Sequence, residues 1–165
     1  MSRVFAAYQR VRDCLTIAIR AIAVDGSRLI DGTEFVGRPA AQSKALIEET
    51  IATIDDLALV GMWAFFEREV IEYVQDRTAA LQAADPQEFA RPLHDKVRAE
   101  IERWRLDDLL DLFKGLVDPN QVGRAKQIKN YRDWVSHRNP NRLPSTQMEP
   151  KDAYAVLLEI ISELE

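Results

Sequence analysis

The sequence has little of what disulfide scaffolds, flexible linkers and cysteine-based metal sites need. It holds one cysteine, Cys14, with six glycines and seven prolines among 165 residues. One cysteine excludes an internal disulfide and a cysteine-rich metal site, and we expect Cys14 to be a small apolar side chain buried on a helix. Glycine and proline are too few for a linker-rich or disordered protein. The sequence also lacks internal repeats and low-complexity tracts.

Long apolar runs are also missing. The N-terminal stretch MSRVFAAYQRVRDCLTIAIRAIAV is interrupted by charged residues, namely Arg10, Arg12, Asp13 and Arg20. It therefore predicts neither a signal-peptide core nor a membrane span, and we expect a cytoplasmic protein with no membrane partner. The length, with 47% hydrophobic and 30% charged residues, is typical of one soluble globular domain over residues 1–165 with a real core.

Histidine is the third scarcity, with two residues in the chain. His94, in RPLHDK, has too few ligand-type neighbours for a metal site and is expected on the surface. The acidic pairs at 55–56 and 107–108 do not match metal-ligand spacing, so we expect neither a metal nor a cofactor; Asp107 could instead cap a helix. Glycine-rich phosphate loops, Ser-His-Asp signatures and HExxH motifs do not occur.

The apolar residues that are present recur at helical spacing and predict an all-α fold. The first helix is expected over residues 2–24, followed by a loop, DGSRLIDGTEFVGRPA, that collects Gly, Asp, Ser and Pro. A second, long helical run is expected to begin near Ser43, a good N-cap, and to reach Leu81 with a kink near Gly61.

Three further helical runs complete the expected bundle. One starts after Pro86 and reaches Leu116, as one helix or as two that meet near residues 105–107. The next is expected to be capped by Asn120 and to end before RNPNRLP, and Pro150 opens the last, since proline suits a first helical turn. We therefore predict a single-domain bundle of about five helices, a layout that short antiparallel connections favour.

The net charge is −5, which argues against bulk, non-specific nucleic-acid binding. The charges are unevenly placed, however. Residues 124–142 contain one acid, Asp133, and six cations, which are Arg124, Lys126, Lys129, Arg132, Arg138 and Arg142. That segment carries +5 and the rest of the chain −10, so the basic residues are concentrated around the stretch NYRDWVSHRNP.

Arg132, in this stretch, falls on the apolar side of its predicted helix. At about 100° per residue, Ile128, Arg132 and Val135 lie within one narrow sector. A guanidinium cannot shed its charge in a protein, so it needs a carboxylate, a phosphate or a water-filled cleft there. One reading is a structural ion pair with an acid of another helix, for which Glu67 and Glu69 of FFEREV are candidates. The other reading is an active site.

His137 follows five residues after Arg132, about 140° around a helical wheel, so one regular helix does not point both side chains the same way. They could meet if the helix frays at its end, which Pro140 encourages. They could also meet across a symmetric dimer, in which a twofold axis places two copies of each residue in one cleft.

Histidine and arginine together suit RNA cleavage without a metal. Histidine can take the proton of a ribose 2′-OH, whose oxygen then attacks the adjacent phosphorus. Arginine fits a phosphate and stabilises the charge that grows on its oxygens. A second histidine, from a partner protomer, could protonate the leaving 5′ oxygen. The flanking phosphates would contact the neighbouring basic residues Lys126, Lys129, Arg138 and Arg142.

The segment Arg132-Asp-Trp-Val-Ser-His137 resembles the R-x4–6-H motif of the HEPN superfamily, with the motif late in the chain and a polar residue directly after the arginine, as is usual there. The resemblance covers roughly ten residues. It implies a small all-helical homodimer and, as in many members, a metal-independent endoribonuclease of a toxin–antitoxin, CRISPR-associated or other defence system acting on single-stranded RNA. It also implies that Arg132 and His137 are catalytic in a dimer cleft, with Asp133 and Ser136 as supporting polar residues.

One position departs from the family pattern. HEPN toxins that pair with a nucleotidyltransferase antitoxin often carry a tyrosine two residues after the histidine, and Asn139 stands there. Silencing by adenylylation is therefore not expected, which leaves a protein antitoxin that blocks the cleft as a candidate partner. Trp134 is the best candidate for a dimer contact, because tryptophan is enriched at interface centres.

Two other functions are compatible with the sequence. The chain could be a catalytically inactive helical binding or dimerisation module in which the Arg/His pair is structural. It could also bind nucleic acid through the basic segment without cutting it.

Overall fold

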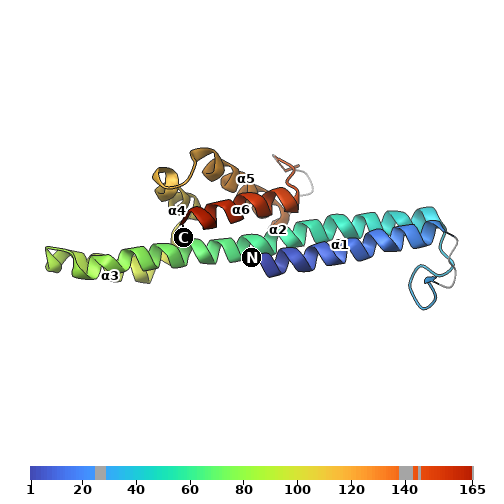
Figure 1. Cartoon of the computed structure of the whole chain (residues 1–165), viewed down its shortest axis with the longest axis horizontal. Coiled ribbons are helices and arrows are strands. Elements are labelled where there is room, and N and C mark those ends of the chain that lie inside the picture. The colour runs from blue at the N-terminus through green and yellow to red at the C-terminus, as the bar shows by residue number, and fades with distance from the viewer. Residues whose placement is uncertain (25–28, 138–142, 145, 165) are drawn as a thin grey trace.

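The computed structural model describes residues 1–24, 29–137, 143–144 and 146–164, and these residues contain helices and no strand. The α-helices are α1 (Ser2–Ala23), α2 (Ala40–Thr78), α3 (Gln87–Glu100), α4 (Leu106–Leu112), α5 (Pro119–Ser136) and α6 (Pro150–Leu164) (Figure 1). Short 3-10 turns follow three of them, namely η2 (Ala79–Ala83), η3 (Ile101–Arg103) and η4 (Phe113–Gly115). The predicted all-α bundle is confirmed, and the third predicted run is two helices, α3 and α4.

Helix α2 is the spine of the molecule. Its 39 residues make it roughly 58 Å long at a rise of about 1.5 Å per residue. Figure 1 shows α1 lying along one half of this spine, α3 folded back along the other end, and α4, α5 and α6 forming a second layer on one side of its middle.

The core lies between the middle of α2 and this second layer. Its largest fully buried side chains come from α2, α4, α5 and α6 and include Trp63, Phe66, Met62, Leu109, Leu110, Ile128, Leu157 and Ile160. Helix α1 joins this core at its N-terminal end, where the ring of Phe5 stacks on that of Tyr154 of α6 with centroids 4.1 Å apart. Aromatic contacts of this kind add to the area that each ring buries.

Two predictions about α2 are wrong. The helix begins at Ala40, after Pro39, and Ser43 lies inside it, 1% exposed. Pro39 explains the earlier start, because its fixed backbone angle and missing N–H suit the edge of a helix. The helix also continues without interruption through Gly61. A Cβ at Gly61 would lie 3.3 Å from Cγ1 of Val4, so this glycine permits the close approach of α1.

The caps of α4 and α5 also differ from the prediction. Asp118 caps α5, and its carboxylate accepts a hydrogen bond of 2.8 Å from the backbone N–H of Asn120. Asp118 takes this role instead of Asn120 because Pro119 occupies the first helical position, which proline favours. In α4, Arg105 is the N-cap and Asp107 lies in the first turn, where a carboxylate interacts favourably with the helix dipole. The predicted start of α6 at Pro150 is confirmed.

The expected burial of two side chains is reversed. Cys14 is exposed, because it lies on the side of α1 opposite Phe5, away from the second layer, and α1 packs only on α2 there. His94 is 4% exposed, since α3 folds back on η2 and places the imidazole against Gln82. Its Nδ1 lies 3.1 Å from Oδ1 of Asp95.

Candidate functional site on helix α5

Arg132 projects from α5 toward α2 and is held by two carboxylates. Its Nη2 lies 3.3 Å from Oε2 of Glu67 on α2, and its Nη1 lies 2.9 Å from Oδ1 of the neighbouring Asp133. The arginine side chain is 24% exposed. The guanidinium carbon lies 5.6 Å from the ring centroid of Trp63, within the range of a cation–π contact. Three different groups therefore fix the orientation of this guanidinium.

The partner of Arg132 on α2 is Glu67, which decides between the two candidate acids. Glu69 is exposed and belongs to a different part of the surface, a hollow beside Tyr73 and Arg77. The predicted position of Arg132 on the apolar side of α5 also holds, since its Nε atom is buried. That Nε and the buried Nε1 of Trp63 hydrogen-bond to no residue within the described part of the chain.

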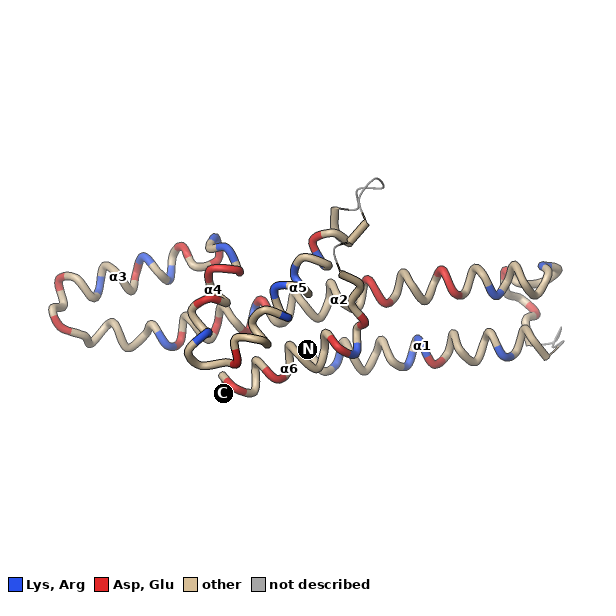
Figure 2. Tube along the Cα trace, turned by 90° about the horizontal axis from the view of Figure 1, so that it is seen from above, with Lys and Arg blue, Asp and Glu red and all other residues tan. Residues whose placement is uncertain are grey.

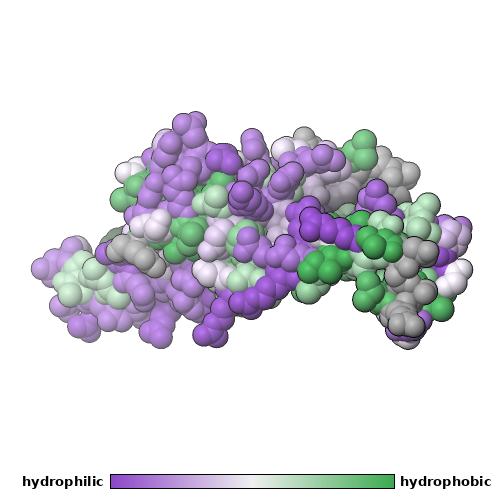
Figure 3. Space-filling model, turned by 45° about the vertical axis from the view of Figure 1, so that its right-hand side comes forward, coloured by the Kyte–Doolittle hydropathy of each residue, from purple (hydrophilic) through white to green (hydrophobic). Residues whose placement is uncertain are grey.

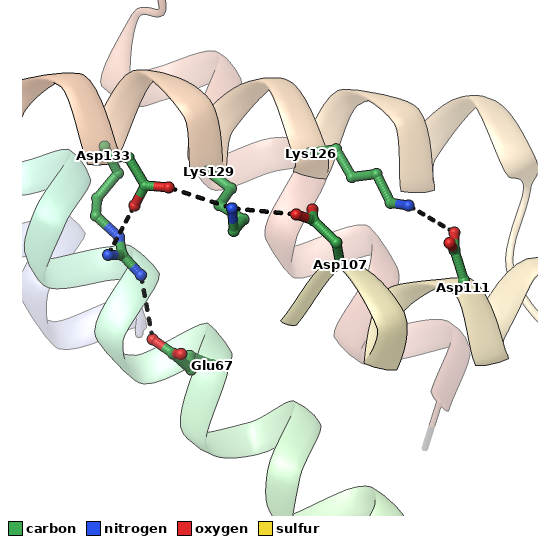
Figure 4. A network of polar contacts seen from close by, with 7 residues as sticks. Glu67, Asp107, Asp111, Lys126, Lys129 and Asp133 are labelled. Carbon is green, nitrogen blue, oxygen red and sulfur yellow. Dashed lines mark hydrogen bonds and ion pairs between the residues drawn. The ribbon is translucent and has the colours of Figure 1, made fainter. Parts of the chain in front are cut away.

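A row of alternating charges continues from Arg132 along the contact between α5 and α4 (Figure 4). Nζ of Lys129 lies 3.2 Å from Oδ2 of Asp133 and 3.2 Å from Oδ2 of Asp107. Nζ of Lys126 lies 2.6 Å from Oδ1 of Asp111, which also receives Lys114 at 2.8 Å. Helices α4 and α5 are thus joined by lysines from one and aspartates from the other.

These contacts move two pKa values. Burial lowers the pKa of Lys129, but its hydrogen bonds to Asp107 and Asp133 outweigh that effect and the net result is a raised pKa. Hydrogen bonds from Lys114 and Lys126 lower the pKa of the Asp111 carboxyl below its usual value. Both shifts favour the charged forms, so the row is a set of ion pairs at neutral pH.

The predicted RNA-binding residues differ in their surroundings. Lys126 and Lys129 are directed at the carboxylates of α4 and are 28% and 20% exposed in their side chains. Arg138 and Arg142 lie outside the described residues. Arg124, two residues before Lys126, is exposed and makes no ion pair with any residue in the described ranges. A phosphate that reaches Lys126 or Lys129 has to compete with an aspartate.

His137 stands at the end of α5, exposed to solvent. It is the C-cap residue, and its backbone N–H still donates to the carbonyl of Asp133 at 3.0 Å. Ser136, the last helical residue, is also exposed. The helix is therefore regular up to the histidine and does not fray before it. Among residues 1–24, 29–137, 143–144 and 146–164, no hydrogen bond or ion pair joins Arg132 to His137.

Trp134, the predicted dimer contact, is half-buried. Its ring centroid lies 5.7 Å from that of Tyr131, one turn earlier on α5. Tyr131 in turn donates a hydrogen bond of 2.8 Å to Asp56 of α2. The tryptophan thus has a place within the chain, and its role at a dimer contact stays a prediction.

The sequence pattern indicates which of the residues that contact α5 lie on a common helix face, but not that they contact α5. Trp63 and Glu67 are four residues apart on α2, and Asp107 and Asp111 are four apart on α4. Residues with this spacing share a helix face. From the shared face one could predict that the two residues of each pair contact the same neighbouring helix. Which helix that is depends on how α2, α4 and α5 pack, and the spacing does not contain that information.

No protein-family model, curated protein or solved structure matches the chain. Within the described residues, no three or more His, Cys, Asp and Glu side chains are grouped as a metal ion would require. None of the helices described combines the length and apolar content needed to cross a bilayer. The chain is thus defined by its all-α fold and by the geometry around Arg132 and His137.

Proposed function

We propose that this chain is a metal-independent endoribonuclease that cleaves single-stranded RNA in a cleft between two protomers. The observation that carries the proposal is that an oriented arginine and an exposed histidine both lie at the C-terminal end of α5. Arg132 is oriented by Glu67, Asp133 and Trp63, and His137 is exposed at the C-cap of the same helix. A fixed cation and an accessible imidazole are the two groups that metal-free RNA cleavage needs.

The proposed reaction uses these two groups as follows. The imidazole of His137 removes the proton of a ribose 2′-OH, and the 2′ oxygen forms a bond to the adjacent phosphorus. The bond from phosphorus to the 5′ oxygen breaks, and that oxygen takes a proton from the imidazolium of the second protomer's histidine. The guanidinium of Arg132 stabilises the charge on the phosphoryl oxygens. The products are a 2′,3′-cyclic phosphate and a 5′-hydroxyl end.

The dimer is part of the proposal because of the helix geometry. A five-residue step along α5 separates Arg132 from His137 by about 140° around the axis and about 7.5 Å along it. Because α5 stays regular up to His137, a second protomer is the simpler way to bring an arginine and a histidine to one phosphate. A protein antitoxin that covers this cleft would be the natural inhibitor in a toxin–antitoxin or defence setting.

A second candidate function has its own observation in its favour. Glu67 and Asp133 already neutralise Arg132, and Lys126 and Lys129 are paired with aspartates of α4. Each of these cations therefore has a partner without any nucleic acid. On this view the chain is a helical binding or dimerisation module, and the charges serve to join α2, α4 and α5.

Cleavage of single-stranded RNA in the presence of EDTA distinguishes the two functions. The wild type should cut and leave cyclic phosphate ends, and His137→Asn and Arg132→Ala should each lose at least a hundredfold in rate, in line with the loss of a proton-transfer or charge-stabilising group. Arg124→Ala, which removes an exposed arginine of the same helix, is the matched control and should keep most of the rate. A wild type that leaves RNA intact both with and without EDTA supports the binding module. Cleavage that occurs without EDTA and stops when EDTA is added rejects the metal-free mechanism.

A mixing experiment tests the composite cleft separately. If Arg132 of one protomer works with His137 of the other, heterodimers of Arg132→Ala and His137→Asn chains retain one complete Arg/His combination. Such a heterodimer keeps one histidine to remove the 2′-OH proton, and water replaces the missing histidine as the proton donor to the 5′ oxygen, so the mixture should regain a small part of the activity that both variants lack alone. A mixture that stays inactive argues for a site within one chain, without affecting the assignment of the two residues.

A further inference from the structure

Helices α1 and α2 extend past α5 and α6 as a two-helix arm, residues 11–24 and 40–57, whose base still contacts α5 through Asp56 and Tyr131 (Figure 1). The core ends near the base of this arm, since its contributions from α1 are Phe5 and Tyr8. Within the arm itself only Ser43, Ile47 and Asp56 are buried. Two helices can cover only the narrow seam where they touch, so every apolar side chain of the arm except Ile47 stays at least partly exposed.

A second apolar stripe follows α1 along the arm, away from the seam. Its members recur every three or four residues and are Val11, Cys14, Ile17, Ala18, Ala21 and Val24. Val11 is 44% exposed, Ile17 62% and Val24 76%, and Cys14 is exposed as well. The spacing is that of an amphipathic helix that packs on a neighbour.

Helix α2 carries a matching stripe of Leu46, Thr50, Thr53 and Leu57. Leu57 is 63% exposed. The two threonines present their methyl groups, because Thr50 donates its hydroxyl to the carbonyl of Leu46 at 2.8 Å and Thr53 donates to that of Glu49 at 3.1 Å. The stripe is therefore less polar than its sequence suggests.

The two stripes lie on one face of the arm, turned away from the second layer of helices. Nine residues correspond to about 180° on a helix. Cys14 is nine residues after Phe5, which stacks on Tyr154 of α6, and Leu57 is nine residues before Phe66, which is fully buried in the core. We call this surface the outer face. Figure 3 shows hydrophobic side chains gathered toward the end of the molecule that carries the arm.

Charge on the arm favours a second copy of the chain as the occupant of the outer face. On the arm, residues 11–24 have two arginines and one aspartate, +1, whereas residues 40–57 have one lysine and four acids, −3. Figure 2 shows this division between the two helices. Arg20 and Glu49 make no ion pair with any residue in the described part of the chain. A surface with one basic and one acidic helix is complementary to itself after a twofold rotation.

We propose that two copies of this chain associate through their outer faces, with the twofold axis parallel to the arm. Helix α1 of each copy then lies on α2 of the other, and the arms form an antiparallel four-helix bundle whose core is the two outer faces. In this arrangement Arg20 lies on the same edge as Glu49 of the second copy, about one helical turn or slightly more apart along the axis. The surface lies opposite the α5 side of the molecule, so this association does not depend on the proposed nuclease and leaves His137 accessible.

The molar mass in solution tests this interface. Leu57→Glu should halve the mass found for the wild type by light scattering, whether the wild type is a dimer or a larger assembly that also uses the α5 cleft. Leu112→Glu is the matched control, because Leu112 is a helical leucine on α4 that is 58% exposed and lies outside the outer face. The control should keep the wild-type mass, and circular dichroism should show that both variants remain folded. A monomeric wild type, or an unchanged mass for Leu57→Glu, overturns the proposal.

Charge reversal tests the direction of packing. Arg20→Glu and Glu49→Arg should each weaken association about tenfold or more, and the double variant should recover it. A double variant weaker than both single variants overturns the parallel twofold axis.

Discussion

Glu67 and Arg132 are 65 residues apart in the sequence and form an ion pair of 3.3 Å between α2 and α5. The glutamate side chain is 39% exposed and the arginine 24%, so the pair is partly shielded from solvent. Partial shielding strengthens the attraction compared with a surface pair but also leaves a carboxylate on the guanidinium that an RNA phosphate would need. This one contact therefore affects both the stability of the fold and the proposed chemistry.

Glu67→Gln should destabilise the protein by about 1 kcal/mol, because it removes one of the two carboxylates that neutralise a largely buried guanidinium. Chemical denaturation measures the loss. Glu69→Gln is the control, since Glu69 is exposed on the same helix two residues later and should cost less than about 0.5 kcal/mol. Equal losses in the two variants would mean that the ion pair contributes nothing specific.

The same variant has a separate consequence for RNA cleavage. If Glu67 mainly competes with phosphate, Glu67→Gln lowers KM and leaves kcat near the wild-type value. If Glu67 mainly orients Arg132 for the transition state, kcat falls instead. The pattern of KM and kcat thus assigns the role of Glu67, and an unchanged pair of constants would exclude both roles.

Adjacent phenylalanines on α2 offer a test of where the core lies. Phe66 is fully buried, whereas Phe65 is 49% exposed. Phe66→Ala should cost about 3–5 kcal/mol because it leaves a cavity, and Phe65→Ala should cost about 1 kcal/mol or less. Thermal and denaturant unfolding would measure both. Similar losses for the two variants would contradict the orientation of α2 against the second layer.

Helical periodicity was sufficient to predict the fold class, because apolar residues such as Ile47, Ile51 and Ile54 repeat at a spacing that only a helix satisfies. It could not predict which apolar stripe is covered. Helix α1 has two such stripes, and the one with Cys14 is exposed because it faces away from the second layer. His94 is the opposite case, since its burial results from the return of α3 onto η2.

The candidate site, like the fold, could be predicted from the sequence only in part. The wheel position of Arg132 was enough to predict that it needs an anionic partner. It was not enough to choose among 27 acidic residues, because the choice depends on the packing of α5 against α2. The pairing of Lys126 and Lys129 with α4 also comes from packing, and it changes how accessible these lysines are to a phosphate.

Acid should weaken the contact between α4 and α5. Lys114 and Lys126 lower the pKa of Asp111 in the folded protein. A lowered carboxyl pKa contributes stability above the pKa of the unfolded chain, and this contribution disappears as the pH falls through the folded value. Asp111→Asn should therefore be less stable than the wild type at neutral pH, and the difference should vanish in strong acid. Asp108→Asn is the control, because Asp108 is an exposed neighbour without an ion pair to a described residue, and it should change the stability little at neutral pH.

A titration to high pH should detect the hydrogen bond between Tyr8 and Asp55 at the base of the arm. The hydroxyl of Tyr8 donates to Asp55 at 2.8 Å and accepts from Arg12 at 2.8 Å. Burial, followed by the bond to Asp55, raises the pKa of Tyr8 from 10.0 to about 12. Since the folded pKa is raised, the contribution of Tyr8 to stability is complete below the unfolded value and is lost as the pH rises through the folded value.

Ultraviolet absorbance of tyrosinate would measure this titration, because the chain has four tyrosines and one of them should ionise about two pH units after an ordinary phenol. Tyr8→Phe should remove that late step and leave the rest of the curve in place. Asp55→Asn should move the step to lower pH, since the carboxylate that accepts the hydrogen bond and repels the phenolate is then neutral. A late step that persists in Tyr8→Phe would assign the raised pKa to another tyrosine.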